Sequence, residues 1–164
     1  MYLIVGASGS GKSTVARKLC EVCGMKEVIS YTTRPKRYDG EEGHIFVERY
    51  DGNGVCYSEF NCYEYWCTKE QLNECDVYVV DWNGIDMLKE NDSLKEDDVI
   101  VYLNVDEDVR ARRMRIRGDS EEMVKERIEN DRKMFPEDRM YDADIIFNNM
   151  SVEEIINELQ SEAN

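Results

Sequence analysis

The 164-residue sequence predicts a three-layer α/β fold built on a doubly wound parallel sheet. Short apolar runs, each the length of one buried strand, alternate along the chain with segments whose apolar residues recur at helical spacing. A glycine-rich loop joins the first of these strands to the first helix. At this length the chain is expected to form a single domain around one core.

The elements follow in order along the chain. Residues 2–5 (Tyr-Leu-Ile-Val) form an apolar run that a glycine ends, as expected of a buried central strand. Further strands are predicted at residues 27–29, 77–80, 99–105 and 143–147. Helices are predicted at residues 13–23, 68–73, 85–90, 107–134 and 152–160. Aromatic residues and glycine turns between residues 45 and 65 indicate a small antiparallel insert.

The charge balance is strongly acidic, with 21 Lys and Arg residues against 36 Asp and Glu residues and a formal net charge of −15. Long-range attraction to nucleic acid or anionic lipid is therefore disfavoured, and we expect neither as a partner. No apolar run approaches the ~20 residues of a membrane span, and no secretory signal is read, so the cytoplasm is the expected compartment. The cysteines are then expected to be reduced thiols: Cys20, Cys23, Cys56, Cys62, Cys67 and Cys75.

The glycine-rich loop at residues 6–14 fits the pattern G-x-x-x-x-G-K-[ST] and lies between a predicted strand and a predicted helix, as this phosphate loop (P-loop) requires. Its backbone N–H groups would surround a phosphate at the helix N-terminus, Lys12 would reach the γ-phosphate, and Ser13 would offer a hydroxyl to Mg²⁺. The sequence therefore predicts a P-loop NTPase fold that binds ATP with Mg²⁺. The expected ATP-binding residues here are Gly6, Ala7, Ser8, Gly9, Ser10, Gly11, Lys12, Ser13 and Thr14.

A second anion site is predicted at residues 30–37, Ser-Tyr-Thr-Thr-Arg-Pro-Lys-Arg. Arg34 and Arg37 flank Pro35 in an otherwise acidic chain, and the guanidinium group is suited to forked hydrogen bonding of phosphate oxygens. A solvated turn is the alternative interpretation. The loop at residues 6–14 does not identify the phosphoryl acceptor, because GTPases, ATPases and small-molecule kinases share it.

At this stretch the sequence resembles the guanylate kinase family, whose members carry Ser-x-Thr-Thr-Arg-x-x-Arg and then a glycine, a tyrosine and a phenylalanine. The likeness runs across nearly the whole chain. It implies that Arg34 and Arg37 hold the acceptor's phosphate, helped by Tyr65, and that Ser30 approaches the guanine base. His44 stands where the family has a phosphate-binding tyrosine, with a solvated loop residue as the alternative.

Two positions depart from the family in the region that should read the base. A gapless count back from Tyr65 puts Cys56 at the position of the family's glutamate, and Cys67 at the position of its serine. Cys67 is kept among the expected acceptor contacts, although a thiol is a poor acceptor for the N–H groups of guanine. Glu59 or Glu64 are the candidates to replace the carboxylate, and Thr68 the hydroxyl.

Asp81 follows the apolar run at residues 77–80, and the segment Asp-Trp-Asn-Gly resembles the family's Asp-x-x-Gly. A carboxylate at the carboxyl end of a parallel strand could order Mg²⁺ through water or contact the acceptor's base. The alternative is a helix N-cap, since aspartate is a preferred cap. The two roles are compatible.

An arginine-rich segment precedes Gly118-Asp119-Ser120, which is expected to break the helix. The resemblance makes this segment a lid over about residues 113–127, in which Arg113, Arg117 and Arg127 close over the transferring phosphoryl group. Their charge suits a transition state with negative charge on its equatorial oxygens. The remaining arginines are assigned to a charged solvent face: Arg110, Arg112 and Arg115.

The resemblance implies one domain, with a core of residues 1–33 and 68–164 and an acceptor-binding insert of about residues 34–67. Asn148 matches a family position near the adenine ring. The implied function is transfer of the γ-phosphoryl group of ATP to a nucleoside monophosphate, with GMP or dGMP favoured. The alternatives are a kinase of another nucleoside monophosphate or of a small phosphate ester such as ribose 1,5-bisphosphate, and a non-catalytic binding module. The expected assembly is a monomer or a homodimer.

Overall fold

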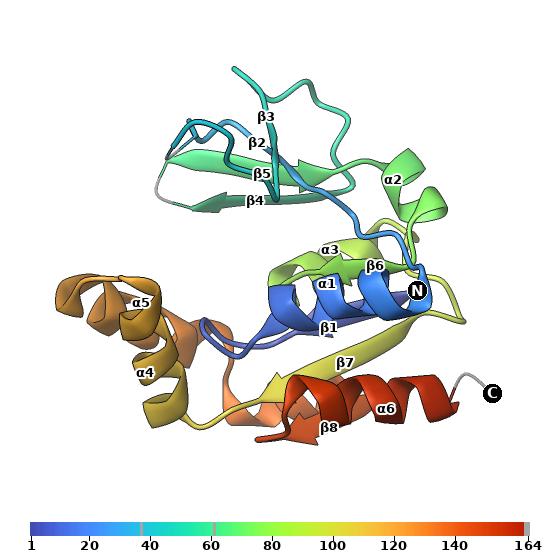
Figure 1. Ribbon diagram of the computed structural model, residues 1–164. Coiled ribbons are helices and arrows are strands. Elements are labelled where there is room, and N and C mark those ends of the chain that lie inside the picture. Colours follow the sequence, from blue (N-terminus) through green and yellow to red (C-terminus); the bar gives the residue numbers. More distant parts are fainter. Residues whose placement is uncertain (37, 61, 163–164) are drawn as a thin grey trace.

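The computed structural model describes residues 1–36, 38–60 and 62–162, and a four-stranded parallel sheet lies at its centre (Figure 1). Its spatial order is β6-β1-β7-β8. Every neighbouring pair is parallel, and the first apolar run of the sequence lies between two other strands. The predicted parallel sheet with a buried first strand is confirmed. Its strands are β1 (Tyr2–Val5), β6 (Val77–Val79), β7 (Val99–Asn104) and β8 (Ile145–Asn148).

The strand predicted at residues 27–29 is reduced to one isolated parallel bridge, from Glu27 to Val77 of β6. The N–H group of Val28 still donates to the Val77 carbonyl at 2.8 Å. The carbonyl of Ile29 accepts instead from the side-chain amide of Gln71, 2.8 Å away on α2 (Lys69–Glu74). The prediction of a full strand was wrong: after one bridge, the backbone at Ile29 bonds to a side chain and not to a neighbouring strand.

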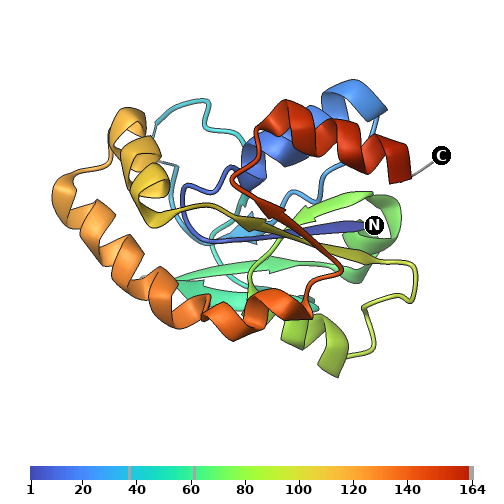
Figure 2. The same ribbon diagram turned by 90° about the horizontal axis from the view of Figure 1, so that it is seen from below.

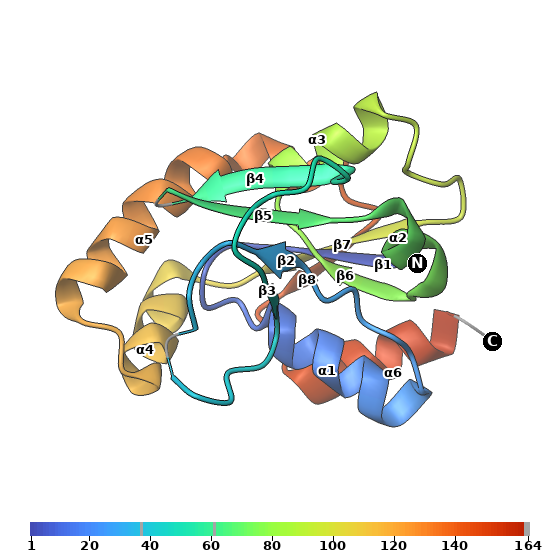
Figure 3. The same ribbon diagram turned by 90° about the horizontal axis from the view of Figure 1, so that it is seen from above.

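Helices cover both faces of the parallel sheet (Figures 2 and 3). The helices α1 (Lys12–Cys23) and α6 (Val152–Glu162) lie side by side on one face, and α3 (Trp82–Glu90) lies on the other. Side chains of each strand point alternately to the two faces, so β1 contributes Ile4 to the first and Leu3 to the second. The predicted three-layer architecture is confirmed.

The insert is a second four-stranded sheet, in the order β3-β2-β5-β4, and Figure 1 shows it above the core sheet. It differs from the prediction in two ways. The sheet begins at Tyr31, before the expected boundary at residue 34, because Tyr31 pairs with Trp66 and their rings stack with centroids 5.5 Å apart. It is also mixed, since β2 and β3 are parallel. The strands are β2 (Tyr31–Thr32), β3 (Ile45–Phe46), β4 (Cys56–Phe60) and β5 (Tyr63–Cys67).

The arginine-rich segment forms two helices, α4 (Glu107–Arg117) and α5 (Glu121–Met134), beside the loop that follows β1 (Figure 1). Gly118 ends α4 in a left-handed conformation with φ of 100°, and the Ser120 hydroxyl caps α5 by accepting from the N–H of Met123. The predicted break is confirmed. Among the helices of the described ranges, none combines the length and the apolarity needed to cross a bilayer.

Candidate active site

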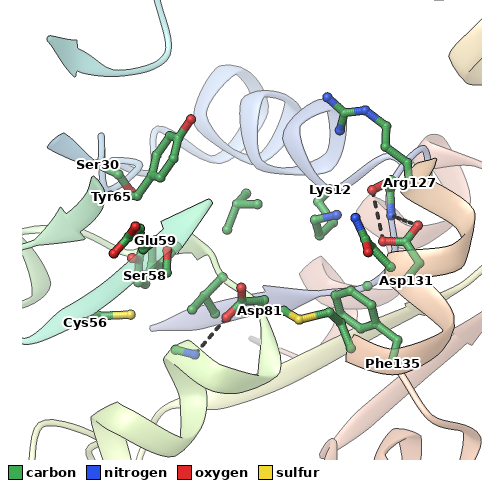
Figure 4. Close-up of a pocket in the computed structure, with 18 of the residues that line it drawn as sticks. Lys12, Ser30, Cys56, Ser58, Glu59, Tyr65, Asp81, Arg127, Asp131 and Phe135 are labelled. Carbon is green, nitrogen blue, oxygen red and sulfur yellow. Dashed lines mark hydrogen bonds between the residues drawn. The ribbon is translucent and has the colours of Figure 1, made fainter. Parts of the chain in front are cut away.

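A cleft of about 610 Å³ lies between the phosphate loop, the insert and α5. Figure 4 shows residues from the insert and from the segment leading into it on one side of the cleft, and residues of the phosphate loop and α5 on the other. The cleft therefore joins segments from the beginning, the middle and the end of the chain. Residues that line it include Ser8, Lys12, Ser30, His44, Cys56, Ser58, Glu59, Tyr65, Tyr78, Asp81, Arg127, Asp131 and Phe135.

The phosphate loop leaves several of its backbone N–H groups available to a ligand. In the described part of the chain, the N–H groups of Gly9, Gly11, Lys12 and Ser13 donate to no carbonyl, so they can serve an anion at the N-terminus of α1. Gly9 has a φ of +77°, and a Cβ there would lie 2.8 Å from the carbonyl oxygen of Arg110. Glycine is therefore required where α4 approaches the loop.

Lys12 folds back over the loop, and its Nζ donates to the carbonyl of Ala7 at 3.0 Å. Burial lowers the pKa of Lys12 from 10.5 to about 8, while the nearby carboxylates of Asp131 and Asp81 raise it. The ammonium group thus lies in a low-dielectric region where its charge acts strongly on a bound phosphate.

Ser13 and Asp81 are the residues predicted to hold Mg²⁺. Ser13 is exposed in the first turn of α1, and Asp81 lines the cleft close enough to influence the pKa of Lys12. Hydroxyl and carboxylate oxygens are the donors that Mg²⁺ prefers, so the two side chains fit the ion. Asp81 is also the N-cap of α3, because its Oδ1 accepts from the N–H of Gly84 at 2.8 Å. The predicted N-cap role is confirmed.

The arginines assigned to the lid gather near the phosphate loop. One guanidinium nitrogen of Arg113 donates to the carbonyls of Gly9 and Ser10, at 3.3 and 3.1 Å. Arg117 and Arg127 both approach Asp119, the first through a hydrogen-bonded ion pair and the second at 3.7 Å. Arg127 also lines the cleft.

Arg110 was predicted to lie on a solvent face, and this prediction is wrong, because only 8% of its surface is exposed. Its guanidinium donates to the carbonyl of Ser8 at 3.3 Å, to the carbonyl of Val105 at 3.0 Å and to Asp131 Oδ2 at 2.9 Å. Arg112 is exposed, and Arg115 is exposed and paired with Glu121, as predicted.

Sequence reasoning missed Asp131 altogether. It is 7% exposed, and it accepts from both the N–H and the hydroxyl of Ser8, at 2.9 and 3.0 Å. A signal for it exists in the sequence: Asp131 follows Val124 and Ile128 at spacings of seven and three, on the apolar face of α5. A carboxylate on such a face requires a buried partner.

Arg34, predicted to bind the acceptor's phosphate, is not among the residues that line the cleft. It is buried and forms a forked ion pair with Glu41, at 2.8 and 3.2 Å, and it also donates to the Pro35 carbonyl. Hydrogen bonding to Glu41 first, and to Tyr65 in addition, raises the pKa of Arg34. The charge of Arg34 is therefore engaged within the insert, near Tyr65, which lines the cleft. Arg37 lies outside the described residues.

Ser30, His44 and Tyr65 line the cleft, as the sequence predicted for acceptor contacts. The ring of His44 packs edge-on against Tyr65 and Phe46, with centroid distances of 5.6 and 6.1 Å. Asn148, predicted near the adenine, is exposed at the end of β8 and accepts from the side-chain amide of Asn104 at 2.7 Å. It does not line this cleft.

The two cysteines at the expected base-contact positions, Cys56 and Cys67, differ in their access to the cleft. Cys67 has no exposed surface and does not line the cleft, so its expected contact with the acceptor is not supported, whereas its register partner Cys56 does line it. Hydrogen bonding to Cys67 and burial raise the pKa of the Cys56 thiol, which is therefore neutral. Its side chain offers only a weak acceptor to a base.

Of the residues predicted to replace the missing base contacts, Glu59 alone lines the cleft. Glu64, its register partner on β5, instead accepts from the hydroxyl of Tyr57 at 3.0 Å. The Thr68 hydroxyl accepts from the N–H of Gln71 and caps α2. Ser58 adds a hydroxyl that sequence reasoning did not identify, beside Glu59 in Figure 4.

Comparison with known proteins places the chain in a family. Residues 3–135 match the family model described as an AAA domain. The chain is 30% identical over 160 residues to the guanylate kinase of Agrobacterium fabrum, covering 87% of this chain and 72% of that protein. It is 27% identical to the guanylate kinase of Fusobacterium nucleatum, covering 98% of this chain and 94% of that protein.

The fold agrees with a solved structure. The crystal structure of guanylate kinase from Anaplasma phagocytophilum superposes with a TM-score of 0.65 and 23% identity, over 98% of this chain and 82% of the other. The architecture described above is therefore that of a known fold, and the sequence matches extend over most of the same residues. This chain belongs to the guanylate kinase family of P-loop proteins.

Proposed function

We propose that the protein transfers the γ-phosphoryl group of ATP to GMP or dGMP, forming ADP and GDP or dGDP. The observation that carries this proposal is a single cleft with Lys12 and Arg127 on one side and Ser30 and Tyr65 on the other. Cys56, Ser58 and Glu59 lie on the same side as Ser30 and Tyr65 and are the candidates for contact with the base. Donor and acceptor phosphates can therefore meet in one enclosure. The relatives named guanylate kinase have this activity by name.

On the donor side, ATP would lie with its β- and γ-phosphates at the N-terminus of α1. Lys12 and the unpaired N–H groups of the loop would bind phosphate oxygens. Ser13 and Asp81 would hold Mg²⁺, which neutralises charge on the β- and γ-phosphates when bound. Asn148, the last residue of the edge strand β8, would lie near the adenine.

On the acceptor side, Tyr65 and His44 would contact the phosphate, with Arg34 and Arg37 supplying positive charge. Ser30 would approach the base, and Asp81 would contact either the base or the Mg²⁺ shell. A carboxylate that accepts from two adjacent N–H groups distinguishes guanine from adenine, and Glu59, a residue that lines the cleft, is the candidate to supply one.

The reaction needs no general base, because the attacking phosphate oxygen of the acceptor is already ionised. The residues instead align donor and acceptor and stabilise the charge of the transition state. Arg113, Arg117 and Arg127 are the candidates for that stabilisation. Arg117 and Arg127 both pair with the carboxylate of Asp119 in this structure. To contact the phosphoryl group, they would leave this carboxylate and pair with phosphate oxygens.

The substrates of this proposal are free small molecules, and nucleic acid and membranes have no part in it. The acidic composition supports that restriction, and a cytoplasmic monomer or homodimer is the form in which we place the reaction. A binding module would not need an intact phosphate loop with lid arginines. A kinase of another phosphate ester would need both, but it would not need a carboxylate residue such as Glu59 at the base-binding side of the cleft.

A coupled assay of ADP formation tests the proposal, using the purified chain with MgATP and one acceptor at a time: GMP, dGMP, AMP, CMP, UMP or ribose 1,5-bisphosphate. GMP or dGMP should give the highest kcat/KM. A preference for any other acceptor would replace guanine in the proposal, and ADP formation with none of them would contradict phosphoryl transfer altogether.

A further inference from the structure

Ser8, Arg110 and Asp131 form a buried cluster, here called the Ser8 clamp, between the phosphate loop and the two lid helices. Each polar atom of Ser8 is engaged. Its N–H and its hydroxyl donate to the two carboxylate oxygens of Asp131, at 2.9 and 3.0 Å, and its carbonyl accepts from Arg110 at 3.3 Å. Asp131 and Arg110 then close the cluster with an ion pair of 2.9 Å.

The clamp connects three segments that are distant in sequence. Ser8 belongs to the loop after β1, Arg110 to the first turn of α4, and Asp131 to the last turn of α5. Both charged side chains are more than nine-tenths buried. In such surroundings a hydrogen-bonded charge pair is strong, and the loss of one partner leaves the other charge buried and uncompensated.

The clamp's position relates it to the reaction. Ser8 directly precedes Gly9 and Ser10, whose carbonyls Arg113 contacts. Asp131 lies one helical turn after Arg127, and both line the cleft. The clamp thus fixes the distance between the loop that would bind the γ-phosphate and the arginines that would stabilise it.

We propose that Asp131 is a positioning residue for phosphoryl transfer, acting through Ser8 and Arg110 to hold the phosphate loop and the arginine-bearing helices α4 and α5 in one fixed arrangement. The kinetic part of this inference rests on the proposed function. Asp131 acts through its partners because both of its oxygens are occupied by hydrogen bonds from Ser8 and Arg110. Misplacement of catalytic groups by about 1 Å can lower a rate by about 100-fold.

The test compares Asp131→Asn with Glu129→Gln in the full chain. Both changes remove one carboxylate charge from α5, but Glu129 is exposed and lies outside the clamp. Three quantities are measured for each variant: the Tm, the amide hydrogen exchange of peptides covering residues 6–14, and kcat and KM with MgATP and GMP. Because the amide of Asn cannot accept all the donors that Asp131 accepts, the loop should loosen.

For Asp131→Asn we expect faster exchange across residues 6–14, a kcat about 100-fold lower and a KM for GMP within about threefold of the original. Glu129→Gln should match the unaltered chain in all three quantities. Ser8→Ala removes only the hydroxyl, so it should fold even if Asp131→Asn does not, and we expect it to lower kcat about fivefold with the same KM.

Four outcomes would overturn the inference. A lower Tm with unchanged kcat would make the clamp merely structural. A raised KM with unchanged kcat would make Asp131 an acceptor contact. Unchanged exchange over residues 6–14 would show that Asp131 does not order the loop, a result that stands even if the chain turns over no acceptor and the proposed function fails. If Asp131→Asn fails to fold, unchanged kcat in Ser8→Ala overturns it.

Discussion

The donor half of the cleft and the acceptor half are held together by different kinds of contact. The phosphate loop is fixed from outside, by Arg110 and Asp131, more than a hundred residues away in the chain. The insert is fixed largely from within, since Arg34 is paired with Glu41 only seven residues later. The first half is thus held by charged side chains from distant helices. The second half is held by ion pairing over a short stretch of sequence and by the packing of Cys56 and Cys67 against the core.

This difference separates two kinds of functional effect. Changes in the donor half should lower kcat for every acceptor, because they displace groups that act on the transferring phosphoryl. Changes in the insert should instead alter which acceptor is used or how tightly it binds. The two halves meet where α3 packs against β4, at Gly84 and Cys56.

The largest effect is expected for Lys12→Ala. Removal of the ammonium group that would bind the phosphates should lower kcat at least about 1,000-fold with every acceptor. The fold should survive, since among the described residues the Lys12 ammonium donates a single hydrogen bond, to the carbonyl of Ala7. Steady-state kinetics and the Tm would measure both, with Lys18→Ala on the same helix as a control of unchanged rate. A lower kcat with one acceptor only would contradict the expectation that changes in the donor half affect all acceptors alike.

Arg127→Ala should have the next largest effect, a fall of about 100-fold in kcat with KM for GMP within about threefold. Arg127 lines the cleft, and its ion pair within the described ranges is a long one, 3.7 Å to Asp119, so the helix should tolerate its loss. The same measurements on Arg112→Ala, an exposed arginine of α4, provide the control. A rise in KM with kcat intact would assign Arg127 to acceptor binding instead.

The donor half was also the part that the sequence predicted best, for a physical reason. The residues of the phosphate loop are contiguous in sequence, and the strand and helix beside it can also be predicted from their apolar patterns. Glycine and serine likewise mark the break between the two helices at residues 118–120. Contacts between distant segments leave no comparable pattern. Arg110 stands among other arginines in the sequence. The sequence alone does not show that Arg110 pairs with Asp131 while its neighbours are exposed to solvent.

In the insert, the sequence located the residues but not their partners. Arg34 was expected to face a phosphate, whereas Glu41 holds it inside the insert. Cys67 was expected at the acceptor, but it is fully buried beside its register partner Cys56, and of the two only Cys56 lines the cleft. Burial and ion pairing decide these positions, and both depend on contacts with other segments that a short strand does not encode locally.

Gly84→Ala tests the contact between the two halves. A Cβ at this position would clash with Val80 and lie 2.8 Å from the sulfur of Cys56, so β4 must move away from α3. We expect a loss of about 2 kcal/mol in the free energy of unfolding, measured by urea denaturation, and a raised KM for GMP. Asn83→Ala, on the exposed side of the same helix turn, should change neither. A stable variant with lower kcat for all acceptors would mean that a change at this contact disturbs the donor half as well as the acceptor half.

The smallest expected effect, and the most specific, concerns the register partners Glu59 and Glu64. Glu59→Gln leaves one acceptor oxygen for a base but replaces the other with a donor, which opposes the N–H groups of guanine. We expect kcat/KM for GMP to fall about 10-fold relative to AMP, with kcat nearly unchanged. Glu64→Gln is the matched control, because that carboxylate binds Tyr57 away from the cleft and the same change should leave the ratio unaltered. Equal ratios in the two variants would remove Glu59 from base recognition and leave Ser30, Ser58 and Asp81 as the polar groups that could perform it.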